Sequence, residues 1–373
     1  MMKNCLGIIN LDENKNRMNE LVRNRTLAAV PLAARYRVID FVLSNMANAG
    51  IEDIGIFTEN KSRSLVEHLT NGRPWDLNRK KDGLRVFNFG DNHPNIDDVH
   101  NFADNITYIE KSRKEYVLIS PSYMICNIDY EEVVKHHINS GKDITIVYKN
   151  VDNANKNFIK CETVNISEER VISIGENIGR EKNAKINMEM YVMKTSLFMD
   201  IVHECIKTGR YRKFKRYIEN NLNKLDVGVY EFKGYLSCIN SIKSYFNTNL
   251  GLLDQNKYKE LFHNNNPIYT KSKDEPPTQY TKTSLVSNSI IGNGSYIEGE
   301  VKNCIIGRRV IIQKGAKLEN CVVLDNSVIG TNVIMSNVIA DKNSLIPGNR
   351  VIRGTENYPV TIQIKGEYFR QYV

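Results

Sequence analysis

Hydrophobic and polar positions are patterned in two different ways along the 373-residue chain, and the change falls near residue 284. In the first part, short β-branched runs predict buried strands, and stretches with helical spacing of apolar residues lie between them. The predicted strands are Leu6–Ile9, Ile54–Phe57, Tyr116–Ile119 and Ile144–Tyr148. We predict helices at Arg37–Ala49, before Gly50, and at Asp129–Asn139, before Gly141. This alternation predicts an α/β domain over 1–250, with a mostly parallel sheet covered by helices on both faces.

A six-residue repeat begins after residue 284. Asn288-Ser-Ile-Ile-Gly292 is followed by Asn303-Cys-Ile-Ile-Gly307 and Asn326-Ser-Val-Ile-Gly330. Aliphatic residues recur at the same spacing in three successive runs: Leu285, Ile291 and Ile297; Ile306, Ile312, Leu318 and Leu324; Ile329 and Met335. Such hexads predict a left-handed parallel β-helix over 284–373, whose coils stack their aliphatic side chains inside. The intervening residues 251–283 are predicted to be a linker, because 270–283 are polar and contain Pro276-Pro277.

Composition excludes several classes of protein. Lys and Arg number 51 and Asp and Glu 43, a net charge of +8, and 25% charged residues are ordinary for a folded soluble protein. No apolar run approaches the roughly 18 residues of a membrane span, and the N-terminus does not resemble a signal peptide. The seven cysteines form no C-x-x-C pair, which argues against a metal site and favours reduced thiols. We therefore expect a cytoplasmic protein that does not interact with membranes.

Particular residues argue against nucleic-acid binding and against acyl transfer. The densest basic run, Lys207–Arg216, holds six Lys or Arg residues, but we interpret it as a solvated helix face and expect no nucleic-acid partner. Many proteins with hexapeptide repeats are acyltransferases that use a histidine as general base. None of the seven histidines follows His263, so the β-helix offers no such base.

Three segments carry a resemblance to the ADP-glucose pyrophosphorylases, also called glucose-1-phosphate adenylyltransferases. Residues 25–51 resemble the segment after that family's nucleotide loop, most tellingly in Tyr-Arg-Val-Ile-Asp-Phe-Val-Leu-Ser-Asn (36–45). Tyr245-Phe-Asn-Thr-Asn-Leu-Gly-Leu252 resembles the motif that closes its catalytic domain, and the hexads resemble its β-helix. The resemblance spans essentially the whole chain. It implies a nucleotidyltransferase-like, Rossmann-type domain followed by a left-handed β-helix.

The sequence departs from that family at the catalytic motifs. The family's glycine-rich loop, G-G-x-G-T-R-L, is matched by Asn10–Arg17, which has no glycine and two acidic residues, with Arg17 only loosely in place of the loop arginine. The family's lysine is matched by Leu27, and its two aspartates are matched by Tyr123 and Cys238. Because carboxylates hold Mg²⁺ and bare backbone N–H groups cradle triphosphate, we predict no catalytic residues and no metal or other cofactor in this chain.

This combination resembles the GlgD-type subunits of the family, in which a chain with a degenerate site modulates a catalytic homologue. The resemblance implies a hetero- or homo-tetramer with that homologue, which would hold the Mg²⁺. The alternative is an adenylyltransferase of low activity whose working carboxylates are hidden by a shifted alignment. Asp12, Glu13 and Asp129 are the nearby carboxylates, and the main candidate is Asp129, six residues beyond Tyr123, although its position is better explained as a helix N-cap.

Four arginines are candidates for binding a phosphorylated effector. Arg25 and Arg37 match positions that contact anionic effectors between the two domains in the family, and Arg308 and Arg309 resemble the basic contribution of the β-helix. A guanidinium can bind phosphate at two points and keeps its charge. For Arg37 a structural ion pair with Asp40 is an equal alternative, and for Arg308 and Arg309 a solvated edge is the alternative we favour. The family's effector-site lysine and histidine are matched by Asn24 and Pro31, which leaves the effector unidentified.

Overall fold

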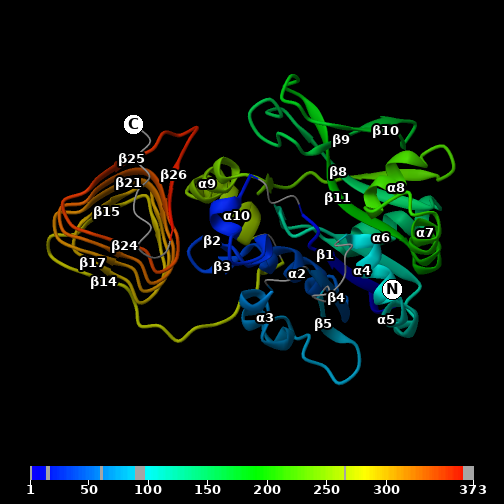
Figure 1. Cartoon of the computed structure of the whole chain (residues 1–373), viewed down its shortest axis with the longest axis horizontal. Coiled ribbons are helices and arrows are strands. Elements are labelled where there is room, and N and C mark those ends of the chain that lie inside the picture. The colour runs from blue at the N-terminus through cyan, green and yellow to red at the C-terminus, as the bar shows by residue number, and fades with distance from the viewer. Residues whose placement is uncertain (1, 14–16, 59–61, 89–96, 264–265, 364–373) are drawn as a thin grey trace.

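The computed structural model describes residues 2–13, 17–58, 62–88, 97–263 and 266–363, which form an α/β domain beside a stack of triangular coils (Figure 1). A nine-stranded sheet forms the centre of the α/β domain. In spatial order its strands are β5 (Gly83–Asn88), β4 (Asp53–Thr58), β1 (Cys5–Asn10), β6 (Tyr116–Ser120), β11 (Ala184–Lys194), β8 (Ile144–Val151), β12 (Val227–Glu231), β10 (Arg170–Glu176) and β9 (Glu162–Ser167). All four strands predicted from the sequence are confirmed, as β1, β4, β6 and β8.

The sheet is mixed, so the expectation of a mostly parallel sheet is wrong for half of it. Strands β5, β4, β1 and β6 are parallel, with Ile8 opposite Gly55 and Ile119. Strand β11 then lies antiparallel to both β6 and β8, and β10 lies antiparallel to β12 and β9. The reason lies in the connections, because no helix separates β8, β9, β10 and β11 along the chain, and strands joined without a crossover pair antiparallel.

Helices cover both faces of this sheet, each over its own apolar core. One face packs against α2 (Val38–Asn48), α6 (Tyr130–Ser140) and α9 (Ile242–Gly251). The other packs against α4 (Asp98–Asp104), α5 (Ile106–Ser112), α7 (Thr195–Thr208) and α8 (Phe214–Asn220). The remaining helical elements are α1 (Asn19–Val22), α3 (Arg63–Leu69), α10 (Gln255–Phe262), η1 (Met2–Asn4), η2 (Leu27–Ala29) and η3 (Thr70–Trp75). Among the described residues, no helix is both long enough and apolar enough to cross a membrane.

The two predicted helices end where their cap residues indicate. Asp129 Oδ1 accepts a hydrogen bond from the backbone N–H of Glu131 at 2.8 Å, so Asp129 is the N-cap of α6. Gly141 follows that helix with φ +64°, and Gly50 follows α2 with φ +81°, which are left-handed conformations that favour glycine.

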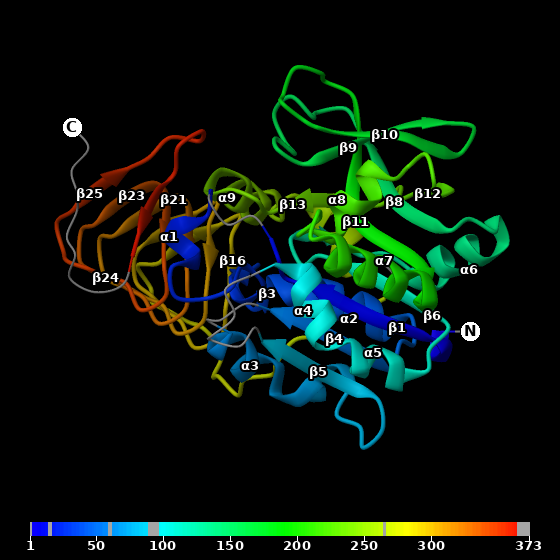
Figure 2. The same ribbon diagram turned by 45° about the vertical axis from the view of Figure 1, so that its right-hand side comes forward.

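The C-terminal part is a parallel β-helix with three sides, drawn in yellow to red in Figures 1 and 2. One side is built from β14 (Gln279–Tyr280), β17 (Tyr296–Ile297), β20 (Ile311–Ile312), β22 (Val328–Ile329) and β24 (Leu345–Ile346). The other two sides are built from β15 (Leu285–Ser287), β16 (Ile290–Ile291), β18 (Glu300–Lys302), β19 (Ile305–Ile306), β21 (Lys317–Val323), β23 (Ile334–Ala340), β25 (Val351–Arg353) and β26 (Val360–Ile362). Strands β21 and β23 each turn a corner and belong to both sides.

Most hexad residues fill the interior. Ile297, Ile306, Ile312, Leu318, Ile329 and Met335 are buried inside the coils, and Ile291 is partly buried against them. Leu285, predicted to point inward, is 66% exposed, because Val286 takes the position that stacks on Val301. Leu324 belongs instead to the core of the α/β domain. The six-residue period therefore predicts the coils correctly. It fails for Leu285 and Leu324, whose side chains do not point into the coil.

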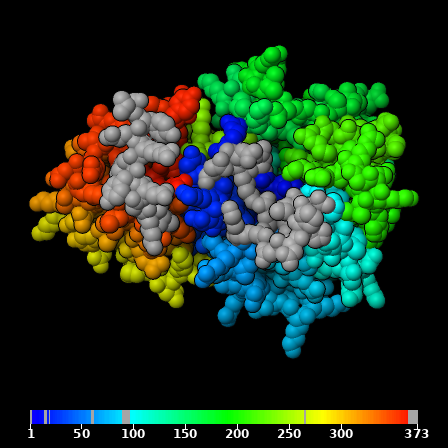
Figure 3. Space-filling model, viewed as in Figure 1, coloured from blue at the N-terminus to red at the C-terminus, as the bar shows by residue number. Residues whose placement is uncertain are grey.

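One side of the β-helix packs against the α/β domain. Ile305, Val322 and Ile339 stack on successive coils with their side chains pointing outward, and they are buried in the same core as α9, which contacts β21. Figure 3 shows the β-helix and the α/β domain in close contact. Alternate residues of the same strands therefore serve two cores, one inside the coil and one between the domains.

Residues 251–283, predicted to be a linker, contain regular structure. Helix α10 (Gln255–Phe262) buries Leu261 and stacks Phe262 on Tyr36, with ring centroids 5.0 Å apart. Strand β14 already pairs with β17, so the first coil starts before residue 284. The remaining part of the α/β domain is a two-stranded ribbon of β7 (Met124–Cys126) and β13 (Leu236–Cys238), and a shorter one of β2 (Pro31–Leu32) and β3 (Tyr36–Arg37).

Candidate functional site

Two of the three positions that match family catalytic groups lie side by side. In the ribbon of β7 and β13, Cys238 pairs with Met124, and the N–H of Ile239 donates to the carbonyl oxygen of Tyr123 at 2.9 Å. Tyr123 and Cys238 are therefore neighbours, as two ligands of one metal ion would have to be. Leu27 begins η2, and its side chain is buried in the apolar core.

Neither Tyr123 nor Cys238 suits a magnesium ion. Burial raises the pKa of the Tyr123 phenol well above its usual value, and the Glu189 carboxylate that accepts its hydrogen bond raises it further. Burial also raises the pKa of the Cys238 thiol well above its usual value, together with the Cys161 sulfur in contact with it. Both groups stay neutral at neutral pH, whereas Mg²⁺ takes oxygen ligands such as carboxylates. Over the described ranges, no three His, Cys, Asp or Glu side chains are grouped as metal ligands. The residues present do not fit the ion.

The carboxylates near this ribbon are paired with lysines of the chain itself. Lys215 Nζ lies 2.7 Å from Glu189 Oε1 and 3.0 Å from Glu162 Oε1. Burial opposes the charge of Lys215, but the two carboxylates outweigh it, so its pKa is raised. The pKa of Glu162 is also raised, because burial and the nearby Glu189 charge outweigh its contact with the lysine. Asn187 Nδ2 donates to Glu162 Oε2 at 3.1 Å and completes the cluster.

Glu189 takes its place through an irregularity in β11. The register of β11 against β8 shifts between Asn187 and Met190, which is a β-bulge. Glu189 sits in the bulge with φ +54°, a left-handed conformation that is uncommon for a residue with a side chain. Its N–H donates to Asn187 Oδ1 at 2.9 Å. Glu189 was not among the predicted site residues, although a lone acidic residue in the apolar run Ile186–Met193 is a possible signal of such a site.

The basic run Lys207–Arg216 is not a wholly solvated face, which corrects the interpretation made from the sequence. Lys213 Nζ lies 2.9 Å from Asp12 Oδ2, and Lys215 reaches Glu162 and Glu189. The loop after β1 is held on a second side, because Glu13 Oε1 accepts from the N–H of Ser122 at 2.6 Å. Residues 14–16 of the expected nucleotide loop lie outside the described residues.

Three further residues of this region, Asp129, Arg17 and Asp98, have structural partners. Asp129, the candidate hidden carboxylate, caps α6 through its side chain. Arg17 donates to the carbonyl oxygen of Ile159 at 3.3 Å, an exposed structural contact. Asp98 was not predicted. It accepts hydrogen bonds from Asn10 Nδ2 at 2.8 Å and from the N–H of Phe214 at 3.0 Å, and burial, together with the nearby Asp12 charge, raises its pKa to about 7.

A cavity of about 210 Å³ lies between the α/β domain and the β-helix. Six cationic side chains line it: Arg35, Arg37, Lys271, Lys273, Arg308 and Lys342. Its acidic lining residues are Glu67 and Asp325. The excess of positive charge makes this cavity suitable for an anion.

The two predicted arginines in this cavity are held from opposite sides. Arg37 Nη1 donates to the carbonyl oxygen of Ser64 at 2.6 Å and to its Oγ at 3.0 Å, and burial lowers the pKa of Arg37. The predicted alternative was an ion pair between the Arg37 side chain and Asp40. The contact observed is a hydrogen bond from the backbone N–H of Arg37 to Asp40 Oδ2, at 2.9 Å. Arg308 belongs to the β-helix, and its N–H donates to Asp325 Oδ1 at 3.0 Å.

The other two candidate arginines do not line the cavity. Arg25 forms an ion pair with Asp341 of the β-helix and donates to the carbonyl oxygen of Leu21 at 2.7 Å, so it joins the two domains directly. Arg309 is half exposed and pairs with Glu275, with Nε 3.2 Å from Oε1. The structure therefore brings Arg37 and Arg308 together and gives Arg25 and Arg309 other partners.

Lys342, which the sequence analysis missed, is the most perturbed cation of the cavity. Its Nζ lies 3.5 Å from Asp325 Oδ2, and Lys273 Nζ lies 3.7 Å from the same oxygen. Burial lowers the pKa of Lys342 to about 8, and the positive charges of Arg37 and Arg25 act in the same direction. The cavity thus holds more positive charge than its own acidic groups compensate.

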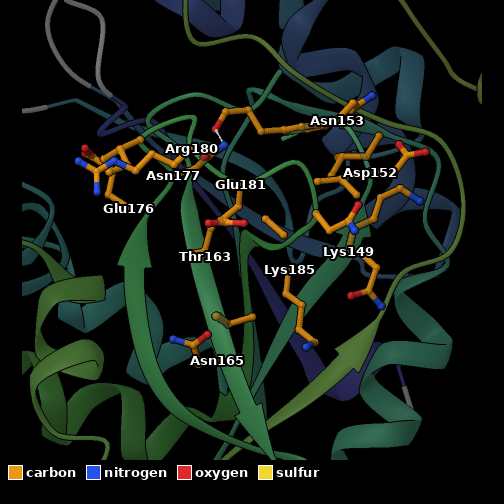
Figure 4. Close-up of a pocket in the computed structure, with 18 residues that line it drawn as sticks. Lys149, Asp152, Asn153, Thr163, Asn165, Glu176, Asn177, Arg180, Glu181 and Lys185 are labelled. Carbon is orange, nitrogen blue, oxygen red and sulfur yellow. Dashed lines mark hydrogen bonds between the residues drawn. The ribbon is translucent and has the colours of Figure 1, made fainter. Parts of the chain in front are cut away.

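A second, larger cavity of about 830 Å³ opens between β8, β9 and β11 (Figure 4). Its charged lining residues balance, with Lys149, Arg180 and Lys185 against Asp152, Glu176 and Glu181. Buried Asn177 forms part of its wall, and its side chain donates to the carbonyl oxygen of Phe158 at 2.9 Å. The lining indicates a polar groove without a preferred sign of charge.

Comparison with known proteins places these features in context. Residues 15–255 match the model of the Nucleotidyl transferase family, and residues 276–357 match that of the GlmU-like C-terminal hexapeptide. A glycogen biosynthesis protein GlgD of Bacillus subtilis is 35% identical over 97% of this chain and 97% of its own length. The GlgD of Geobacillus stearothermophilus is 34% identical over 85% of this chain and 83% of its own. A glucose-1-phosphate adenylyltransferase of Mycoplasma mobile is 28% identical over 85% of each chain.

Proposed function

The chain belongs to the nucleotidyl transferase family that includes the GlgD glycogen biosynthesis proteins and the glucose-1-phosphate adenylyltransferases, and on this basis we propose that it is a regulatory, largely non-catalytic subunit. In this role it binds a catalytic homologue that makes ADP-glucose from ATP and glucose 1-phosphate. The Mg²⁺ of the reaction belongs to that homologue. The assembly of the two is a hetero-tetramer, and a homo-tetramer of this chain is the alternative.

The observation that carries the non-catalytic part of the proposal is the position of Lys215 between Glu162 and Glu189. An ammonium group there already neutralises Glu162 and Glu189, of which Glu189 is hydrogen-bonded to Tyr123. Glu13, the other acidic side chain near Cys238, accepts a hydrogen bond from the N–H of Ser122. A divalent cation would have to displace the ammonium group while finding a neutral phenol and a neutral thiol as its other neighbours. The alternative of a low-activity adenylyltransferase loses its main candidate carboxylate, because Asp129 caps a helix.

The regulatory part of the proposal rests on the cavity between the domains. A phosphorylated metabolite there would contact Arg37 from the α/β domain and Arg308 from the β-helix. Such a ligand would hold the two domains in one relative position, and a ligand shifts a conformational equilibrium only through contacts that differ between states. Couplings of this kind are typically about 1–3 kcal/mol, or roughly 5–150-fold in affinity.

The β-helix supports the proposed assembly. The strands of its first coil, β14, β15 and β16, each lie at the edge of their sheet with one side unpaired. Tyr280 and Leu285 at this end are 54% and 66% exposed. Unpaired edges with apolar side chains favour association with another chain. We also infer that the coils wind left-handed, as expected from the hexads, with corner asparagines such as Asn303 and Asn320 at positive φ. We expect the protein to act in the cytoplasm, where its free thiols would stay reduced.

The decisive experiment compares the purified chain, the catalytic homologue and their mixture. Alone, the chain is expected to form little or no ADP-glucose from ATP, glucose 1-phosphate and Mg²⁺. In the mixture it should change the kinetics or the effector response of the homologue, and the two should elute together on gel filtration. Strong Mg²⁺-dependent turnover by the chain alone would favour the adenylyltransferase alternative. No effect on either kinetics or oligomeric size would reject the regulatory role.

A further inference from the structure

Two cysteine sulfurs are in direct contact beside the β7–β13 ribbon. Cys161 Sγ lies 3.2 Å from Cys238 Sγ, although the two residues are 77 positions apart in the sequence. Both side chains are almost completely buried, with 2% and 4% of their surfaces exposed. Buried thiols that serve only as small apolar groups need no partner of their own kind. Their contact therefore calls for a chemical explanation.

The geometry around the pair allows the sulfurs to approach further. A disulfide requires a sulfur–sulfur distance of about 2.05 Å, so a closure of roughly 1 Å is needed. Cys161 lies in the turn that precedes β9, after Phe158 and Lys160, which both have positive φ. Cys238 is the last residue of the three-residue strand β13. Neither cysteine is therefore fixed in the middle of a long strand.

The polar surroundings distinguish the two thiols. Asn240 Nδ2 lies 3.5 Å from Cys161 Sγ and donates to it. Burial raises the pKa of the Cys238 thiol, and the acidic side chains of Glu189 and Glu13 act in the same direction. We therefore assign the first attack to Cys161, and Cys238 is in contact with it and placed to react in the second step.

We propose that Cys161 and Cys238 are a reversible disulfide site, oxidised by peroxides and reduced by cellular thiols. The Cys161 thiolate attacks a peroxide oxygen and becomes a sulfenic acid, and the peroxide's other oxygen leaves as water or an alcohol. Cys238 sulfur then attacks the Cys161 sulfur, the S–OH bond breaks, and water leaves. With hydrogen peroxide, two thiols and one peroxide give one disulfide and two waters. Two equivalents of a small thiol reverse the bond by exchange.

The disulfide would connect parts of the molecule that now touch without covalent linkage. The carbonyl oxygen of Cys161 accepts from the N–H of Asn177 at 2.8 Å, and Asn177 and Phe158 line the larger cavity. Cys238 lies two residues after Leu236, which lines the same cavity. It directly precedes Ile239, whose N–H donates a hydrogen bond to the carbonyl oxygen of Tyr123. Oxidation would thus fix the wall of this cavity to the β7–β13 ribbon. The inference does not depend on the proposed regulatory role.

The test uses the folded full-length protein. After treatment with hydrogen peroxide, free thiols are blocked with N-ethylmaleimide and the peptides are mapped by mass spectrometry. The expected product is a pair of peptides joined through Cys161 and Cys238, which disappears after dithiothreitol. Cys161→Ser and Cys238→Ser should each abolish it, whereas Cys205→Ser, a buried cysteine in the other core, should leave it unchanged. Recovery of both residues as separate blocked peptides would overturn the proposal.

A second measurement asks whether the bond fits the native fold. Circular dichroism should show an unchanged fold after oxidation, and the thermal midpoint should rise and return with dithiothreitol, because the cross-link closes a long loop. The Cys161→Ser protein should show neither change. A midpoint that falls on oxidation, or a linked peptide that forms only in urea, would mean that the bond belongs to the unfolded chain and would refute the inference.

Discussion

Lys215 places its ammonium group 2.7 Å from the carboxylate of Glu189, which stands in the left-handed bulge of β11. The two residues come from different elements, α8 and β11, and both are partly buried. Glu162 lies 3.0 Å from the same ammonium group on its other side. The three charges form one compact cluster next to Tyr123, whose phenol is hydrogen-bonded to Glu189.

This cluster makes Lys215 important for stability. Lys215→Met would leave two acidic side chains close together and buried without a counter-charge, and breaking a buried ion pair on one side costs about 3–5 kcal/mol. Urea unfolding should show this loss. Lys213→Met is the matched control, because Lys213 is 43% exposed and, within the described ranges, its ion-pair partner is Asp12; the change should cost about 1 kcal/mol or less. Equal losses in the two variants would contradict the assignment.

Asp98 should make the stability of the protein depend on pH. Its pKa is about 7 in the folded state, against an ordinary value of 3.8, so the folded protein binds this proton more tightly than the unfolded chain. The resulting stabilisation is complete below about pH 4 and is lost as the pH rises through about 7, at roughly 1.4 kcal/mol for each unit. Asp98→Asn cannot titrate. The free energy of unfolding of the wild type, relative to Asp98→Asn, should therefore fall between pH 5 and 7; a constant difference would show that Asp98 stays ionised.

Anion binding between the domains should depend on the protonation of Lys342. In the free protein its pKa is lowered to about 8, and a bound anion would raise it again, so binding takes up a proton above that pH. Sulfate is a suitable probe because it does not itself titrate in this range. Calorimetry should give a constant Kd below pH 7.5 and weaker binding above pH 8, by up to about tenfold per unit.

Two variants check the origin of that pH dependence. Lys342→Met should remove it. Lys317→Met, at an exposed lysine on the outer face of the β-helix, should leave it in place. A pH dependence that survives in Lys342→Met would mean that another group of the cavity titrates.

Arg37 and Arg309 should separate the effector response from general charge effects. Arg37 lines the cavity, whereas Arg309 pairs with Glu275 outside it. In the mixed enzyme, Arg37→Ala should weaken the response to a panel of sugar phosphates by about 5-fold or more, within the range of allosteric couplings. Arg309→Ala should leave the response intact. Gel filtration and thermal melting should show that both variants assemble, and equal behaviour of the two would place the effector elsewhere.

Local signals in the sequence predict much of this fold. Asp129 and Gly141 mark the ends of α6 because a cap is made by neighbouring residues, and the hexads predict the coils because each coil repeats the same contacts. The features that were missed depend on residues far apart. Lys215 looks like part of a solvated basic run until the fold places it beside Glu162 and Glu189. Lys342 and Asp325 likewise meet only because two coils stack next to the α/β domain.

The division of labour between alternate residues of the β-helix has a consequence for how such chains can change. Ile306, Val323 and Ala340 hold the coils together, while Ile305, Val322 and Ile339 hold the β-helix to its neighbour. Substitutions at the second set can alter the docking angle of the two domains without unwinding the stack. Substitutions at every second position of these strands could therefore change the contact between the two domains in related proteins, while the stacked coils are preserved.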